Sequence, residues 1–385
     1  MSTYRKILNN INGIYNFVIN YCVSYVIIRR HINNLIKINN VNKLHDKNRK
    51  RQWINRWRSL QCSFAYNSYD FFTHYMGESL DIVPEDICHN IIEPLLNPIK
   101  YRPLYGDKNM FDLFFTINNQ ASNIKTPHTL LRSINGSLFD TNYQATTIDI
   151  STWPEEILIK PSIESDSGRG ILFFKKNKDG KYVSMKDDSL FFSVNLLNKH
   201  YSKNYIIQER LKQCPFMNYL CSTSVNTIRI AIYKSIKDNK SHVLNMILRI
   251  GNEGSLLDNA HAGGLFCSVN KKGLLGKQLF NQHGRSFTEI NGIDFSKGDY
   301  IVPNMDEVLS FACRVGDSIP HLRLLALDIM LDENCNPILI EFNNNGFAPW
   351  LYQMTGQTAL GDYTQEIIEY CVEHKHKSSR IYVCM

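Results

Sequence analysis

LLALDIML at residues 324–331, followed by PILIEFN at residues 337–343, is the stretch that decides the fold. Both runs are short, apolar and rich in strand-forming residues, and residues 332–336 between them have turn chemistry, so the segment predicts a β-hairpin. If the turn is centred between its third and fourth residues, Asp328 lies directly across from Glu341. Two carboxylates on neighbouring strands repel each other in an apolar context, so a positive partner is expected between them.

The positive partner could be a metal ion or a basic side chain. Carboxylate oxygens suit a hard cation such as magnesium, which proteins usually hold with one or two carboxylates plus phosphate oxygens. The same register places Asn343 across from Ala326, which would add an amide to such a site. The alternative is that an arginine or lysine of the sheet neutralises the carboxylates, and the hairpin is then structural only.

A second candidate element is a strand that ends in a lysine and runs into a glycine-rich loop. EILIKP at residues 156–161 carries Lys160, and SDSGRG at residues 165–170 follows it before an apolar strand at residues 171–174. Backbone N–H groups and a hydroxyl in such a loop can bind phosphate. No helix follows the loop, which argues against a Walker A motif and a dinucleotide fingerprint. Alone the segment would be an ordinary hairpin, but beside the acidic hairpin it predicts a phosphate clamp.

A third element is YIIQERL at residues 205–211, where an apolar strand meets polar residues. The backbone of such a segment can pair with an adenine edge while Gln208 or Glu209 contacts the amino group. A strand that simply ends at the surface would have the same sequence. The segment therefore supports a nucleotide site only together with the other two elements.

The order of these elements resembles that of ATP-grasp carboxylate–amine ligases. DK at residues 107–108 comes first. The lysine strand, the glycine-rich loop, the segment at residues 205–211 (the hinge) and the acidic hairpin follow. More closely, the chain is similar to the sugar-transfer-associated ATP-grasp family, which is linked to bacterial surface-polysaccharide genes. The segments that carry this similarity are SVNTIR at 224–229, DNAHAGG at 258–264 and LDIM at 327–330. The resemblance covers about residues 100–365.

The resemblance implies a role for each matching residue. Phosphates of ATP would be bound by Lys108 and Lys160, and covered by Ser167, Gly168 and Gly170 of the loop. Adenine would be framed by Gln208, Glu209 and Leu211. Two magnesium ions would be held by Asp328, Glu341 and Asn343. The transferred phosphate or the substrate carboxylate would be neutralised by Arg229 and Arg249, and His261 belongs to a segment similar to the His-x-Gly-Gly loop of glutamate-adding ligases.

The implied fold is α+β, with two α/β subdomains that clamp ATP and a mostly helical N-terminal region before them. The implied activity is ATP-driven conversion of a carboxylate to an acyl phosphate, followed by attack of an amine. The substrates would be a glycan uronic acid and an amino acid, or a related surface-polymer building block. Two alternatives stay open: an ATP-grasp kinase acting on a sugar or small molecule, and a non-catalytic nucleotide-binding scaffold protein.

Several candidates also have a structural reading. Arg229 and Arg249 could form ion pairs within the sheet, and Lys108 could begin an exposed helix. His261 could shape a glycine-rich turn, and Asn226 could be a cap or turn residue.

Composition limits the class of protein. A chain of 385 residues with 43% hydrophobic residues can bury a large core, as expected of a soluble globular protein. Its 10 cysteines are scattered without any Cys-x-x-Cys pair, which argues against a zinc knuckle or a redox motif. The absence of a disulfide framework, together with the need for ATP, predicts a cytoplasmic location.

The N-terminal sixth carries the excess positive charge. Residues 1–60 contain 12 Lys and Arg and one acid, whereas the remaining residues have a small negative balance. A basic amphipathic region of this kind could lie on the anionic inner face of the membrane, or pack on the body with a solvated basic face. Lys47–Arg51 with Trp53 and Trp57 could also bind nucleic acid, but two tryptophans four residues apart fit a buried helical stripe better.

The expected organisation has three parts. Residues 1–100 form the basic, mostly helical N-terminal region, residues 101–365 the ATP-grasp domain, and residues 366–385 a helix end and tail. Helices are expected near 47–60, 61–77, 84–96, 107–118, 189–201, 305–315 and 363–373. Residues 1–100 lack the alternating strand–helix pattern of the α/β pre-domain that many ATP-grasp ligases use for substrate binding. The substrate site is therefore expected to be built differently.

Overall fold

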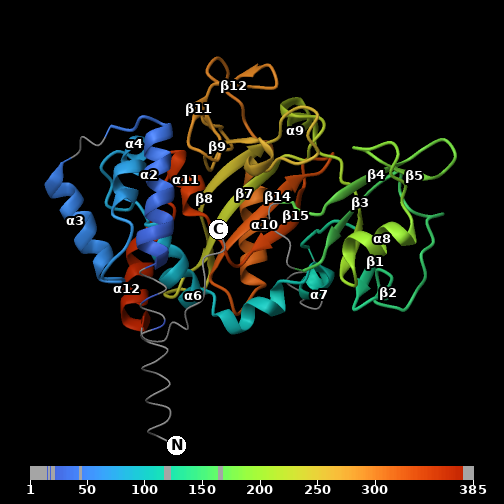
Figure 1. Cartoon of the computed structure of the whole chain (residues 1–385), viewed down its shortest axis with the longest axis horizontal. Helices are drawn as coiled ribbons and strands as arrows, with labels where there is room; N and C mark the ends of the chain where they lie inside the picture. The colour runs from blue at the N-terminus through green and yellow to red at the C-terminus, as the bar shows by residue number, and fades with distance from the viewer. Residues whose placement is uncertain are drawn as a thin grey trace, which may run out of the picture.

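The computed structural model describes residues 15, 18, 22–42, 46–116, 123–163 and 168–375. Two antiparallel sheets, with helices packed around them, organise this part of the chain (Figure 1). The smaller sheet, mostly green, forms one lobe. The larger sheet and the helices around it form the body of the molecule. The blue N-terminal helices lie against the body on the side away from the small lobe (Figure 1).

The smaller sheet has the strand order β2-β1-β6-β3-β4-β5. Its strands are β1 (Thr129–Ile134), β2 (Ser137–Phe139), β3 (Glu156–Pro161), β4 (Leu172–Lys176), β5 (Tyr182–Ser184) and β6 (Tyr205–Glu209). Helix α8 (Val194–Tyr201) packs on it through Leu197 and Tyr201. The sequence predicted this helix from residue 189, but it begins later because the Ser193 side chain caps it, with Oγ accepting from the Leu196 N–H at 3.2 Å.

The larger sheet has the strand order β11-β10-β9-β8-β7-β14-β15. Its strands are β7 (Thr227–Lys234), β8 (Ser241–Ile250), β9 (Leu265–Val269), β10 (Leu279–Phe280), β11 (Ser286–Phe287), β14 (Leu324–Leu331) and β15 (Pro337–Asn343). A small ribbon, β12 (Glu289–Ile290) with β13 (Ile293–Asp294), extends beyond β11. The bridge between Gln213 and Asp332 joins the end of the small lobe to the acidic hairpin.

The two faces of the larger sheet bury different cores. On one face Ile228 and Ile230 pack with Val308 and Phe311 of α10 (Met305–Asp317). On the other face the alternate residue Ala231 joins the core of the N-terminal helices. Strand β7 is therefore buried on both faces, which explains the apolar run at residues 230–233.

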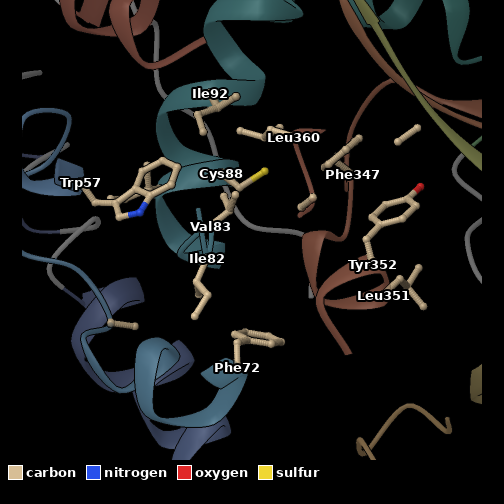
Figure 2. Close-up of a cluster of buried hydrophobic side chains, with 14 of the residues drawn as sticks. Trp57, Phe72, Ile82, Val83, Cys88, Ile92, Phe347, Leu351, Tyr352 and Leu360 are labelled. Atoms are coloured by element: carbon tan, nitrogen blue, oxygen red, sulfur yellow. The ribbon is translucent and has the colours of Figure 1, made fainter. Parts of the chain in front are cut away.

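The N-terminal helices share a hydrophobic core with the body. They are the π-helix η1 (Cys22–Ile28), α2 (Arg29–Ile38), α3 (Lys47–Arg58), α4 (Asn67–Met76), α5 (Glu85–Ile87), the π-helix η2 (Cys88–Ile92) and α6 (Glu93–Leu96). Trp53 and Trp57 are both 0% exposed, which confirms the predicted buried stripe. Figure 2 shows Trp57, Phe72 and Cys88 of this region near Phe347 and Leu351, which belong to the C-terminal part of the chain.

Several of the remaining helices are short and were not predicted from the sequence. They are η3 (Ile99–Tyr105), η4 (Lys108–Met110), α7 (Phe111–Thr116), α9 (Pro215–Leu220), η5 (Ala260–Ala262), α11 (Pro349–Met354), η6 (Gly361–Tyr363) and α12 (Thr364–His374). The helix predicted at 107–118 begins as a 3-10 turn, and its last residues lie outside the described part, as does the tail beyond Lys375. The helix predicted at 84–96 contains a π-helical turn, a local geometry that sequence periodicity does not reveal. No helix in the described ranges combines the length and apolar composition that crossing a bilayer requires.

The acidic hairpin pairs as predicted, although its turn does not lie where it was expected. Asp328 pairs with Glu341 and Ala326 with Asn343, which confirms the predicted register. The turn, however, is centred on Asn334, since Leu331 pairs with Pro337. A β-bulge at Ile340 takes up the one-residue difference, because Ile329 pairs with Leu339 while Asp328 pairs with Glu341. Bulges of this kind bend a strand and re-aim its side chains, and this one lies directly before Glu341.

Candidate functional site

A cluster of charged side chains gathers at the bulged end of the acidic hairpin. Asp328 is 1% exposed and pairs in register with Arg229 of β7. Arg229 Nη1 lies 3.4 Å from both carboxylate oxygens of Asp328, and Arg249 Nη2 lies 3.2 Å from Oδ2. Two arginines therefore neutralise this carboxylate in the ligand-free protein, which is the structural reading of the hairpin.

Arg249 also connects the cluster to the loop after β8. Its Nε lies 3.5 Å from Asp258 Oδ2, and its Nη2 donates to Thr227 Oγ1 at 2.7 Å. Thr227 Oγ1 in turn donates to Asp258 at 2.5 Å. Burial would lower the pKa of Arg249, but Asp258 and then Asp328 raise it above its ordinary value. Arg249 is therefore charged at any physiological pH, and its guanidinium is held by two acids.

Glu341 faces the lysines of the small lobe. Burial alone would raise its pKa, but Lys108 and Lys160, followed by Arg249 and Arg229, lower it below the ordinary value. Lys160 ends β3, and the N–H of Lys108 donates to the carbonyl of Ser162 just beyond that strand at 2.8 Å. Burial lowers the pKa of Lys160 to about 8, because the nearby charge of Glu341 offsets it only in part. The two lobes thus meet where Glu341 of the larger sheet lies near Lys108 and Lys160.

The glycine-rich loop lies against the other lobe. Gly168 and Gly170 have φ angles of 73° and 75°, which side chains other than glycine rarely adopt. A Cβ added at Gly168 would lie 3.0 Å from a methyl group of Leu257, in the loop that also carries Asp258. The hydroxyl of Tyr201 donates to the carbonyl of Gly170 at 2.7 Å and anchors the end of the loop. Ser167, the predicted hydroxyl of this loop, lies outside the described residues.

The predicted hinge residues occupy different environments. Gln208 is buried, and its Nε2 donates to Thr129 Oγ1 at 3.2 Å inside the small sheet. Glu209 ends β6 and is partly exposed, and Leu211 is partly buried just beyond the strand. The amide nitrogen of Gln208 thus bonds within the small lobe, while its Oε1 has no hydrogen-bond partner among the described residues. Glu209 and Leu211 lie at and just beyond the end of β6.

His261 does not join the charged cluster. It is exposed on η5, three residues after Asp258. Asn226 is structural, because its side chain donates to the carbonyls of Met217 and Cys221 at 2.8 and 3.1 Å and accepts from the Gly251 N–H. The cluster therefore brings together Lys108, Lys160, Arg229, Arg249, Asp328 and Glu341, and leaves His261 on the neighbouring turn.

Residues of the paired strands β14 and β15 fit a magnesium–phosphate group. Asp328 and Glu341 provide adjacent hard oxygens, and the amide nitrogen of Asn343 is buried without a hydrogen-bond partner among the residues placed in the structure. No group of three or more His, Cys, Asp or Glu side chains that could hold a metal by itself occurs in the described ranges. A cation here would need phosphate or water oxygens as well, which is how magnesium is normally held.

Comparison with protein families agrees with this geometry. The sequence model of the "Sugar-transfer associated ATP-grasp" family matches residues 89–369, which is most of the chain. This chain belongs to the sugar-transfer-associated ATP-grasp family. The α+β class and the ATP-grasp fold predicted for this family member are confirmed. A search of curated proteins by sequence finds no significant match.

Solved structures with similar folds include several ligases. The ATP-grasp ligase PsnB with minimal precursor, Mg and ADP is 11% identical, with a TM-score of 0.36 over 72% of this chain and 62% of that chain. D-cycloserine synthetase DcsG is 10% identical, with a TM-score of 0.37 over 72% and 73%. D-alanine-D-alanine ligase from Coxiella burnetii is 9% identical, with a TM-score of 0.39 over 73% and 61%. This ATP-grasp family member thus spans less than two thirds of the length of PsnB and of the Coxiella ligase, and these likenesses assign it no activity.

The N-terminal region shapes the loop that follows the acidic hairpin. Glu93 of α6 accepts from the N–H of Phe347 at 2.6 Å, and Arg102 donates to the side chain of Asn345 at 2.6 Å. Asn97 donates to the carbonyl of Asn344 at 3.0 Å. In this ATP-grasp chain, residues 93–102 therefore fix the geometry directly after Asn343, a geometry that the sequence alone left undefined.

Three residues that lie beside the arginines of the cluster were missed as site residues. The available signal for Asp258 and Thr227 was their position within the segments that carry the family resemblance. Tyr352 of α11 had no such signal, because it is one apolar-looking residue of a short helix. Burial raises the pKa of Tyr352 to about 12, and its hydroxyl lies in the field of Arg229 and Asp328.

Proposed function

We propose that this ATP-grasp family member is an ATP-dependent carboxylate–amine ligase. The supporting observation is the convergence of Lys108, Lys160, Arg229 and Arg249 on Asp328 and Glu341 at the meeting point of two lobes. Phosphoryl transfer is accelerated chiefly by positioning and by cations around the transferred group, and little covalent chemistry is needed from the protein. This cluster supplies four cationic side chains that could surround a transferred phosphate.

In the proposed reaction, a carboxylate oxygen attacks the γ-phosphorus of ATP, and the bond to ADP breaks. The acyl phosphate is then attacked by an amine, which forms an amide, releases phosphate and loses a proton. Lys108 and Lys160 would bind the phosphates, Gly168 and Gly170 would cover them, and Glu209 and Leu211 would frame adenine. Arg229 and Arg249 would hold the transferred phosphate or the carboxylate, and His261 would act from the neighbouring turn.

Magnesium ions, two in number, would be held by Asp328, Glu341 and Asn343, and they would supply charge neutralisation at the phosphates when bound. Asp328 is paired with Arg229 and Arg249 in the ligand-free protein. The two arginines would therefore be free to contact phosphate oxygens when a metal takes their place beside Asp328.

The proposed substrates are a glycan uronic acid and an amino acid or related amine, in the assembly or modification of bacterial surface polysaccharide. The family description, which associates these proteins with sugar transfer, supports this choice. The proposed location is the cytoplasm, with its membrane face as the alternative. Helix α2 buries Ile32 and Leu35 and leaves Arg30 and Lys37 exposed, so the described part of the basic region presents positive charge that an anionic surface could contact.

Titration calorimetry with ATP, with and without magnesium, tests the nucleotide site first. A screen of carboxylates and amines for phosphate release then tests ligation, with mass spectrometry of the products. An amide product together with free phosphate supports the ligase. A stable phosphorylated sugar without free phosphate would establish the kinase alternative instead. The absence of any ATP binding would remove the enzymatic proposal and favour a scaffold.

The affinity for MgATP is expected to decrease with pH above the pKa of Lys160, which is about 8 in the free protein. Phosphate favours the protonated lysine, so affinity should be constant below that pKa and should then fall by up to about tenfold per pH unit until the pKa of the bound form is reached. Calorimetry across this range would measure the profile. Lys160→Arg stays charged and should give a flat profile. A wild-type profile as flat as that of the variant would contradict the role of Lys160.

A further inference from the structure

A cavity of about 490 Å³ lies beside the charged cluster, at the ends of β8 and β9. Ala260, Gly263 and Leu265 line one side, and the turn after β10 together with β11 and β12 lines the other. A neighbouring hollow of about 360 Å³ shares Phe287 and Glu289 with it. Figure 1 shows β11 and β12 at the edge of the larger sheet, above β8 and β9.

The lining of this cavity suits a hydroxyl-rich ligand that carries an amine. The polar lining includes the amides of Gln282 and Asn252. Asn252 Nδ2 donates to the carbonyl of Gly263 at 2.7 Å, so its Oδ1 can accept from a hydroxyl group, and Gln282 can donate to one or accept from one. The ring of Phe287 is 40% exposed and offers a flat apolar surface, as needed for the C–H face of a sugar ring. Glu289 and His283 are the titratable residues of the lining, and Glu289 supplies a carboxylate for an ammonium group.

A single turn separates the cavity from the charged cluster. Asp258, which holds Arg249, lies at the start of this turn, and Ala260 and Gly263 face the cavity. The turn is thin, because Gly264 has no room for a side chain against the carbonyl of Asp258. His261 is exposed on the same turn. A ligand in the cavity would therefore be one turn away from the arginines that face the acidic hairpin.

The N-terminal helices hold the outer wall of the cavity. Asn39, at the end of α2, donates to the carbonyl of His283 at 2.7 Å. The hydroxyl of Tyr75 in α4 donates to the carbonyl of Gly284 at 2.8 Å. These contacts attach the turn after β10 to the N-terminal region. The region thus supports a substrate wall, a task that an α/β pre-domain would otherwise perform.

We propose that this cavity binds the amine substrate of the reaction, and that this substrate is an amino sugar or a similarly hydroxyl-rich amine. The inference rests on the ligase function proposed above. Phe287 stacks on the ring, Glu289 binds the ammonium group, and the amides bind hydroxyls.

Ligand-observed NMR with glucosamine and glucose tests the cavity, and calorimetry with MgATP is run on the same full-length proteins. Phe287→Ala should weaken binding of glucosamine and glucose by about fivefold. Glu289→Gln should weaken glucosamine and leave glucose unchanged. Matched controls are Phe191→Ala, an equally exposed phenylalanine of the small lobe at 47%, and Glu333→Gln on the hairpin turn. All four variants should bind MgATP as the wild type does.

The two proposals fail in different ways. MgATP binding without any glucosamine binding, or with equal losses in Phe287→Ala and Phe191→Ala, would overturn the assignment of the cavity and leave the ligase standing. Absence of MgATP binding would overturn the ligase, and with it the acceptor role of the cavity, whatever the sugars do.

Discussion

Glu341→Gln is expected to reduce magnesium-dependent ATP binding and turnover by at least about 100-fold while the protein stays folded. The glutamine has nearly the same shape, but it carries no charge and is a poor ligand for a hard cation. The fold should survive because Lys160, whose pKa is about 8, can release its proton when its carboxylate partner is lost. Calorimetry with and without magnesium measures the effect, and circular dichroism checks the fold.

Glu333→Gln is the matched control, since Glu333 lies exposed on the turn of the same hairpin. Asp328→Asn is less informative as a first variant. It would leave Arg229 buried without its carboxylate and Arg249 with Asp258 alone, and breaking a buried ion pair costs about 3–5 kcal/mol. Unchanged magnesium dependence in Glu341→Gln would remove the proposed metal site.

Trp53→Ala is expected to lower the free energy of unfolding by about 3–5 kcal/mol. Trp53 is 0% exposed, its indole N–H donates to the carbonyl of Ile82 at 2.7 Å, and its ring packs against Phe64 and Tyr69. Because this core includes Ala231 of the larger sheet, we expect the whole body to unfold in one transition at a lower urea concentration. Urea titrations followed by circular dichroism and by tryptophan fluorescence would measure it.

Arg51→Ala, an exposed change on the same helix, should shift stability by no more than about 0.5 kcal/mol. Two separate transitions in Trp53→Ala, with the later one unchanged from the wild type, would show instead that residues 1–100 form an independent domain. The boundary predicted near residue 100 would then be supported.

The hairpin shows both the strength and the limit of reasoning from sequence. The two short apolar runs and the turn residues between them gave the correct pairing of Asp328 with Glu341. The turn centre was wrong by half a residue, and the bulge at Ile340 cancelled that error at the site. A bulge depends on sheet twist and on packing of neighbouring strands, so nothing in the local sequence announces it.

Contacts between distant segments were harder to predict than the segments themselves. The sequence placed Lys160 at the end of a strand, but only the fold shows it near Glu341, which lies 181 positions further along the chain. Gln208 is predicted at the nucleotide, and the fold adds that its Nε2 bonds within its own sheet, a contact that polarity alone does not reveal because a strand residue has two faces. Asp258 was overlooked because nothing in the sequence of its loop indicated that Arg249 would be its partner.

The N-terminal region shows a similar limit. Its helices and buried tryptophans follow from periodicity and composition. Its contacts with the loop after Asn343 and with the turn at Gly284 do not, because they depend on where the helices dock.

The arginines beside Asp328 have a consequence for the order of events in the site. In the ligand-free protein the acidic hairpin already has its counterions, since four cationic side chains face Asp258, Asp328 and Glu341. A metal that binds the carboxylates must displace an arginine, and a displaced buried guanidinium needs a new anion at once. Metal and phosphate should therefore enter together as a complex. Magnesium alone would meet carboxylates that already have cationic partners.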